Sequence, residues 1–166
     1  MTIERHTWLL PRPRRRDKYP GGFPMHFEKK LLELLGIDPK RHKILHPFGG
    51  MAEFGDRVDL RDEVNPTFFG DAHDLSFIDD DTYDLVILDP PYNDEQSKKL
   101  YNTGKVKFGA YMAEAVRVCK PGGLIAVYHW VWTPRPKGCG SEKMIVIITR
   151  VWHRPRVCCI SRKDLR

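Results

Sequence analysis

The stretch Tyr83-Asp84-Leu85-Val86-Ile87-Leu88-Asp89-Pro90-Pro91-Tyr92 carries the strongest structural signal in this chain. Its largely apolar first half predicts a buried strand, and the acid followed by two prolines predicts that the strand stops at Asp89. Open α/β sheets bind ligands beyond the carboxyl ends of their strands. Proline has no backbone donor and a fixed φ, so the carbonyl groups there are held as acceptors. A carboxylate, rigid carbonyls and an aromatic ring together favour a planar group that carries an NH2.

The segments on both sides of this stretch predict an α/β fold. The expected strands are 43–46, 57–60, 67–69, 83–88, 124–130, 144–151 and 156–161. The expected helices are 23–35, with a proline in its first turn and a glycine after its end, and 108–119. These elements predict a seven-stranded, mostly parallel sheet with a terminal antiparallel hairpin. Residues 1–22, rich in Pro, Arg and Gly, are expected to form a basic arm ahead of one domain at 23–166.

Three motifs follow one another in an order that resembles a known enzyme family. Asp89-Pro90-Pro91-Tyr92 resembles the catalytic motif of amino-methyltransferases that use S-adenosylmethionine (AdoMet), the family that methylates adenine N6 or cytosine N4 in DNA. Pro47-Phe48-Gly49-Gly50 resembles its glycine loop after the first strand, and Gly70-Asp71-Ala72 its loop after the third. The resemblance covers about residues 20–160. It implies a Rossmann-like class I methyltransferase fold, AdoMet as cofactor and no metal.

The resemblance also implies which residues hold the cofactor. Asp71 would accept a hydrogen bond from the adenine amine, and Asp59, at the end of the second expected strand, would bind ribose hydroxyls, with Glu53 and Asp62 as alternatives. The glycines would let the backbone approach the ligand closely. As ordinary turn residues, the glycines and Asp71 would need no ligand. The full expected set is His46, Pro47, Phe48, Gly49, Gly50, Asp59, Asp71, Ala72, Asp89, Phe23 and Pro24.

Three features depart from the family pattern. His46 stands where the family usually has an acid near the ammonium group of the cofactor, and Ala52 stands where it usually has the last glycine. Only eight residues separate Gly50 from Asp59, which leaves room for at most a truncated helix. These departures favour one alternative function, a non-catalytic nucleic-acid-binding subunit with a degenerate cofactor site. Binding of AdoMet distinguishes this alternative from an enzyme.

The catalytic residues implied by the resemblance are Asp89, Pro90, Pro91 and Tyr92. The exocyclic amine of a base is a poor nucleophile, because its lone pair is delocalised into the ring. The Asp89 carboxylate and the Pro90 carbonyl would accept both N–H groups and favour a reactive, pyramidal nitrogen, while Tyr92 stacks on the base. A base inside a duplex must be flipped out or presented in a single strand. Adenine N6 in DNA is the first expected target and cytosine N4 the second, and an RNA base is the alternative.

The net charge of +6 is concentrated at the two ends of the chain. Residues 1–18 contain six basic and two acidic side chains, and residues 150–166 contain six and one. Basic ends favour contact with nucleic-acid phosphates, although a solvated tail has the same composition. Trp130 could stack on a base or belong to the core. The expected nucleic-acid contacts are Arg12, Arg14, Arg15, Arg16, Lys98, Lys99 and Trp130.

Other features limit the class of protein. No apolar run approaches the roughly 18 residues that span a bilayer. The four cysteines are expected to be reduced thiols in a cytoplasmic protein, and a zinc site from Cys139, His153 and the pair Cys158-Cys159 would have unusual spacing. No stretch is long enough for a separate target-recognition region. Sequence selectivity is therefore expected to be modest, or to come from a protein partner or a homodimer.

Overall fold

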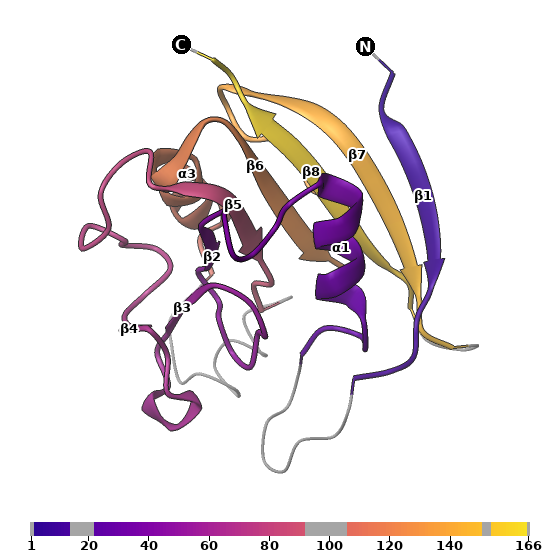
Figure 1. The fold of residues 1–166 in the computed structure, drawn as a ribbon, viewed down its shortest axis with the longest axis horizontal. Helices are drawn as coiled ribbons and strands as arrows, with labels where there is room; N and C mark the ends of the chain where they lie inside the picture. Colours follow the sequence, from indigo (N-terminus) through magenta and orange to yellow (C-terminus); the bar gives the residue numbers. More distant parts are fainter. Residues whose placement is uncertain (1, 14–21, 92–105, 151–153, 166) are drawn as a thin grey trace.

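The computed structural model describes residues 2–13, 22–91, 106–150 and 154–165 (Figure 1). The elements in chain order are β1 (Glu4–Leu9), α1 (Phe27–Leu35), β2 (Ile44–His46), β3 (Asp56–Asp59), the short 3-10 helix η1 (Asp62–Val64), β4 (Phe68–Phe69), β5 (Tyr83–Leu88), α3 (Phe108–Val118), β6 (Cys119–His129), β7 (Cys139–Ile148) and β8 (Arg156–Lys163). The strands form one sheet in the order β1-β7-β8-β6-β5-β2-β3-β4. Among them β8 alone runs antiparallel to its neighbours. The mostly parallel sheet with a terminal antiparallel hairpin is confirmed, with eight strands instead of seven.

The additional strand, β1, lies in the segment that the sequence predicts to be an arm. It pairs in parallel with β7 along its whole length, from Glu4 opposite Lys143 to Leu9 opposite Ile148. Trp8 is its one buried side chain, so the strand shows no apolar run that could have revealed it. The domain boundary at residue 22 stays a prediction, but the sheet already includes residues on the amino-terminal side of it.

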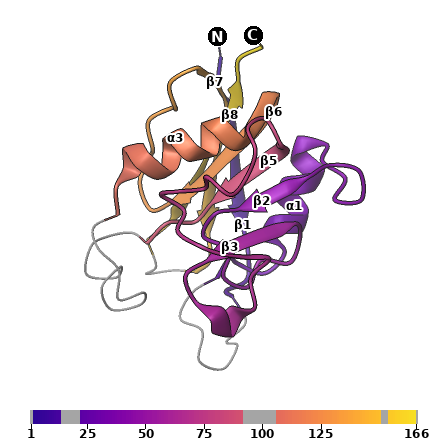
Figure 2. The same cartoon turned by 90° about the vertical axis from the view of Figure 1, so that its left-hand side faces the viewer.

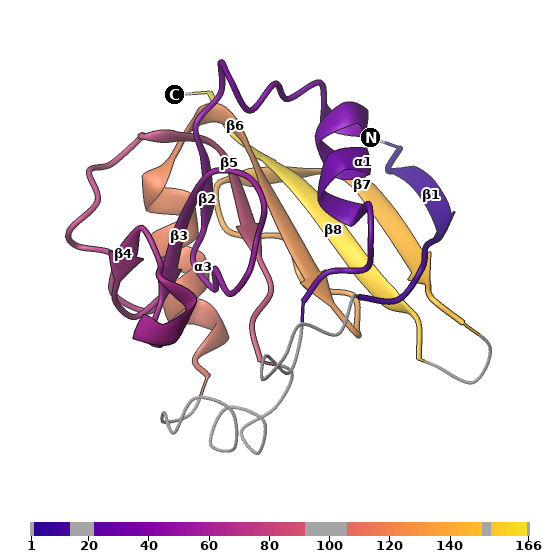
Figure 3. The same ribbon diagram turned by 60° about the horizontal axis from the view of Figure 1, so that its bottom comes forward.

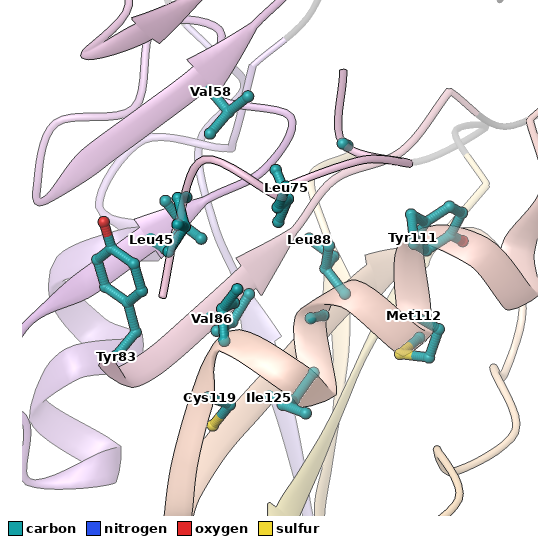
Figure 4. Packing of buried hydrophobic residues seen from close by; sticks show 14 of the residues in the cluster. Leu45, Val58, Leu75, Tyr83, Val86, Leu88, Tyr111, Met112, Cys119 and Ile125 are labelled. Atoms are coloured by element: carbon teal, nitrogen blue, oxygen red, sulfur yellow. The ribbon is translucent and has the colours of Figure 1, made fainter. Parts of the chain in front are cut away.

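The two described α-helices lie on opposite faces of the sheet (Figures 1 and 2). Phe27 and Leu31 of α1 belong to one buried cluster, and Tyr111 and Met112 of α3 belong to the other, which Figure 4 shows. From Leu85 to Leu88, β5 contributes alternate side chains to the two clusters. Because both faces of the strand are covered, its sequence is apolar without alternation.

The two helices end close to where the sequence predicts. α1 starts at Phe27 instead of residue 23, because His26 has a left-handed backbone with φ of 67° and the Phe27 amide donates to the Pro24 carbonyl in a turn. Its carboxyl end is as predicted, with Gly36 at φ 66° after the last turn. α3 begins at Phe108 as predicted and ends one residue earlier, at Val118. Neither is long and apolar enough to cross a membrane.

The order of the strands reverses at β2. The chain continues from β2 to β3 and β4 on one side, then returns to β5 on the other side of β2 and proceeds to β6. These strands are mutually parallel, so their carboxyl ends lie at one edge, which we call the carboxyl edge. In open α/β sheets the crevice at such a reversal is where ligands bind. The fold therefore places a candidate site between the ends of β2 and β5.

Candidate functional site

The predicted motifs come together at the carboxyl edge, which Figure 3 turns toward the viewer. The glycine loop follows β2, Asp59 ends β3, Gly70-Asp71-Ala72 follows β4 and Asp89 follows β5. Because the four strands are parallel, these residues share one edge although 43 positions separate His46 from Asp89. The arrangement agrees with the order of motifs read from the sequence.

The glycine loop connects β2 to β3 through residues 47–55 without a helix, in agreement with the predicted lack of room. The structure explains both glycines. A Cβ on Gly49 would lie 2.5 Å from the Cβ of Arg57, so only glycine allows β3 to approach this closely. Gly50 has φ of 46°, in the left-handed region. The Arg57 guanidinium donates to the Gly50 carbonyl at 2.8 Å, which fixes the loop against β3.

Asp59 holds the glycine loop in place. Its side chain is buried, with Oδ2 accepting from the Gly50 amide at 2.8 Å and Oδ1 accepting from the Arg61 amide at 3.0 Å. A carboxylate can accept further hydrogen bonds, so binding of ribose by Asp59 stays a prediction. The two alternatives, Glu53 and Asp62, are exposed.

Asp71 is tied to a residue that the sequence reading did not single out, His73. Asp71 Oδ1 accepts from the His73 amide at 2.9 Å and lies 2.6 Å from His73 Nδ1, while His73 Nε2 accepts from the Lys107 amide at 3.0 Å. Since Nε2 is an acceptor, the neutral ring carries its proton on Nδ1 and donates it to Asp71. His73 thus joins the Gly-Asp-Ala loop to the start of α3. Ala72 beside it is buried.

Aromatic rings pack these loops together. The Phe48 ring of the glycine loop lies 5.2 Å from Tyr111 of α3 and 6.4 Å from His73, centroid to centroid. On the other side of β2, the Phe23 ring lies 6.1 Å from His46 and 5.3 Å from Tyr128 of β6. The predicted Phe23-Pro24 segment is therefore next to the end of β2, with Pro24 buried.

His46 ends β2 as a neutral, buried side chain. Burial lowers its pKa to about 4, and the positive charge of Arg57 adds to the shift. Its Nε2 lies 3.5 Å from Oε1 of Glu28, a buried acid in the first turn of α1. The sequence analysis does not predict Glu28 as a site residue. The one signal for it is that an acid lies on the otherwise apolar face of this helix. Pro47 next to His46 is buried as well.

The catalytic motif directly follows β5. Asp89 and Pro91 are partly exposed and Pro90 is buried, while Tyr92 lies outside the described residues. Burial raises the pKa of the neighbouring Cys158 thiol, and the negative charge of Asp89 adds to this effect. The Asp89 carboxylate therefore sits near β8 at the carboxyl edge and is partly open to solvent.

Beyond β6, aromatic and basic side chains meet at the same edge. The Arg154 guanidinium lies 5.4 Å from the centre of the Trp130 ring. Trp132 is 55% exposed and lies outside the core, while Trp130 is partly buried. His129 has a lowered pKa because of its burial and of Arg156 nearby.

The amino-terminal segment also reaches this edge. After β1, the Leu10 amide donates to the Ile148 carbonyl and the Pro11 carbonyl accepts from the Met25 amide, which leads to an exposed Arg12. The other predicted basic contacts lie outside the described residues: Arg14, Arg15, Arg16, Lys98 and Lys99.

The cysteines are free thiols, and the described part of the chain contains no candidate metal-binding group. All four cysteines are free, and Cys119, Cys139 and Cys158 are buried. No group of three or more His, Cys, Asp or Glu side chains among the described residues could hold a metal ion. The zinc alternative includes His153, which lies outside these residues.

Comparison with solved structures identifies the fold. TrmN from Thermus thermophilus matches with a TM-score of 0.63 and 18% identity over 86% of this chain, which spans 50% of TrmN. YhhF from Escherichia coli, a proposed methyltransferase, matches with a TM-score of 0.58 and 13% identity, over 95% of this chain and 92% of YhhF. The chain has the Rossmann-like methyltransferase fold.

This methyltransferase fold also occurs in a neighbour that has a protein partner. A proposed methyltransferase in complex with the Trm112 methyltransferase activator of Haloferax volcanii matches with a TM-score of 0.53 and 11% identity, over 84% of this chain and 92% of the other. No protein-family model and no curated protein matches the sequence. At these identities, the comparisons show the fold alone.

Proposed function

We propose that this protein is an AdoMet-dependent methyltransferase that modifies an exocyclic amine of a nucleobase, with adenine N6 in DNA as the first target and cytosine N4 as the second. One observation carries the proposal. The Asp89-Pro90-Pro91 segment follows β5 at the point where the strand order reverses, and the glycine loop follows the neighbouring strand, β2. This is where ligands bind in open α/β sheets.

The surroundings of β2 support AdoMet as the cofactor. The loop after it is braced by Asp59 and Arg57, and the ring of Phe23 flanks the end of the strand. His46 Nε2 is buried and has no hydrogen-bond partner within the described residues, which suits a ligand that donates. AdoMet, when bound, supplies an electrophilic methyl group. The chain itself has to bind the target amine and orient it.

Asp89 and Pro90 would perform this orientation. The carboxylate of Asp89 and the carbonyl of Pro90 each accept a hydrogen bond from one N–H group of the amine. Both hydrogen bonds strengthen as the nitrogen gains positive charge. Asp89 is partly exposed and can meet a base, whereas buried Pro90 fixes the backbone. Tyr92 would stack on the base, as its place in the motif implies.

The surface beside Asp89 suits nucleic acid. Exposed Trp132, the stacked pair Trp130 and Arg154, and exposed Arg12 belong to segments that follow β6, precede β8 and follow β1 at the carboxyl edge. Aromatic rings stack on unpaired bases and guanidinium groups bind phosphates. A base flipped out of a duplex, or one in a single strand, could reach Asp89 from this surface.

The test is mass spectrometry of nucleosides after incubation with AdoMet and separate pools of duplex DNA, single-stranded DNA and total RNA. We expect the wild type to methylate adenine in DNA, and Asp89→Ala to lower the rate by at least about 100-fold, because it removes a transition-state contact. Asp79→Ala, which removes an exposed acid from the loop ahead of β5, at the opposite end of the strand from Asp89, is the control and should keep full activity.

Each other outcome excludes part of the proposal. Methylation of RNA alone would show that the protein is the RNA base methyltransferase of the alternative. Methylation of cytosine in DNA would make cytosine N4, and not adenine N6, the target. Equal activity of the wild type and Asp89→Ala would exclude Asp89 as a catalytic residue. If the wild type binds no AdoMet, the enzyme is excluded and the alternative of a non-catalytic nucleic-acid-binding subunit is favoured.

A further inference from the structure

A buried acid and a buried imidazole face each other behind the glycine loop. Glu28, in the first turn of α1, is 8% exposed, and His46, the last residue of β2, is 1% exposed. Glu28 Oε1 lies 3.5 Å from His46 Nε2. This Nε2 has no hydrogen-bond partner among the described residues. A buried polar atom without a partner is costly, so its retention here needs a reason.

The protonation state of His46 leaves a hydrogen-bond acceptor at this pair, which suits a ligand that donates hydrogen bonds. With its pKa lowered to about 4 by burial, the ring is neutral near neutral pH. A hydrogen bond to the Phe54 backbone favours the charged ring, which means that the ring donates there. Since Nε2 is without a partner, Nδ1 makes that contact and Nε2 keeps its lone pair. A carboxylate oxygen and a lone pair then face one another, and a cationic donor could hydrogen-bond to both.

The position of the pair connects it to the candidate cofactor site. Both oxygens of Glu28 accept from the Glu53 amide, at 3.1 Å each, and Glu53 belongs to the loop that follows β2. The Phe23 ring lies 6.1 Å from His46 on the same side. The glycine loop and the amino-terminal turn of α1 therefore both border the pair.

We propose that Glu28, together with His46, binds the ammonium group at the amino-acid end of the cofactor. Glu28 would take the place of the acid that the sequence lacks at position 46, with the carboxylate supplied by a helix in place of a strand end. The ammonium would donate one N–H to Glu28 Oε1 and another to His46 Nε2, and its charge would be neutralised by the buried carboxylate. This inference rests on the proposed use of AdoMet.

The test is a double-mutant cycle between Glu28 and the amino group of the ligand, measured by isothermal titration calorimetry. The ligands are S-adenosylhomocysteine (SAH) and its analogue in which hydrogen replaces the amino group. Wild type should bind SAH at least about tenfold more tightly than the analogue, because a charge-assisted contact is lost. In Glu28→Gln this preference should be much smaller, because the charged acceptor is gone and only neutral acceptors are left for the ammonium, while the analogue binds as tightly as it does to wild type.

The matched control is Glu33→Gln, which removes the same charge from an exposed position of the same helix and should keep the preference for SAH. Binding of the analogue shows that Glu28→Gln is folded, and the comparison of the two ligands on wild type needs no variant at all. Equal binding of both ligands by wild type, or an unchanged preference in Glu28→Gln, would overturn this inference and leave the proposed function intact. Wild type that binds neither ligand would overturn both.

Discussion

Lowering the pH should destabilise this protein through His46. The pKa of His46 falls from 6.5 to about 4, mainly because burial disfavours the charged ring, although Glu28 lies 3.5 Å away. In the unfolded chain the ring regains its ordinary pKa. Between these two values the unfolded state binds a proton that the folded state does not. The contribution of His46 to stability is therefore complete above about pH 6.5 and is lost as the pH falls to about 4.

The size of this effect follows from the two pKa values. A difference of between two and three pKa units corresponds to about 3 kcal/mol. Urea unfolding followed by circular dichroism at several pH values would measure it, with His46→Asn as the variant that cannot titrate. The difference in unfolding free energy between wild type and variant should fall by about 3 kcal/mol from neutral pH to pH 4. Parallel curves for the two proteins would refute the assignment of a neutral, buried His46.

Two further substitutions test how the loops are held. Asp59→Asn should destabilise the fold by about 1–3 kcal/mol, because either the buried Gly50 amide or the partly buried Arg61 amide loses its acceptor. Exposed Asp62→Asn should change little in the same urea titration. Lys163→Met should lower the free energy of unfolding by about 2–4 kcal/mol, because the buried ammonium donates to the Val116 and Cys119 carbonyls at the end of α3. If the melting temperature falls no further than in the exposed control Lys137→Met, these contacts contribute little.

Most of the central strands can be predicted from the sequence, because they are covered on both faces of the sheet and are therefore continuously apolar. The run from Leu85 to Leu88 must be apolar throughout, and the same holds for 124–127 in β6. β1 could not be read in this way. It lies at the edge of the sheet, buries only Trp8 among its six residues, and pairs with a strand 139 positions further along the chain.

Some residues of the candidate site can likewise be predicted from the sequence and others cannot. Motifs at strand ends, such as the glycine loop and Asp89, could be placed from the sequence because parallel strands bring their carboxyl ends together. Glu28 and His73 could not, since their importance depends on partners that pairing and packing bring near: His46 for Glu28, and the Lys107 amide for His73. The exposure of Trp132 is likewise set by where the chain leaves β6 and not by its sequence neighbours.

The loop between β2 and β3 contains no helix that could hold its shape. The affinity for a ligand bound by this loop should therefore depend on how readily the neighbouring strands unfold locally. The shape of the loop depends on Asp59 and Arg57, both in β3, and β3 pairs outward only with the two-residue strand β4. Local unfolding of β3 and β4 at this end of the sheet would therefore also release Gly50 from its contacts with Asp59 and Arg57. A ligand held by the loop would therefore slow hydrogen exchange as far away as β4, and a substitution in β4 would weaken binding without touching the ligand.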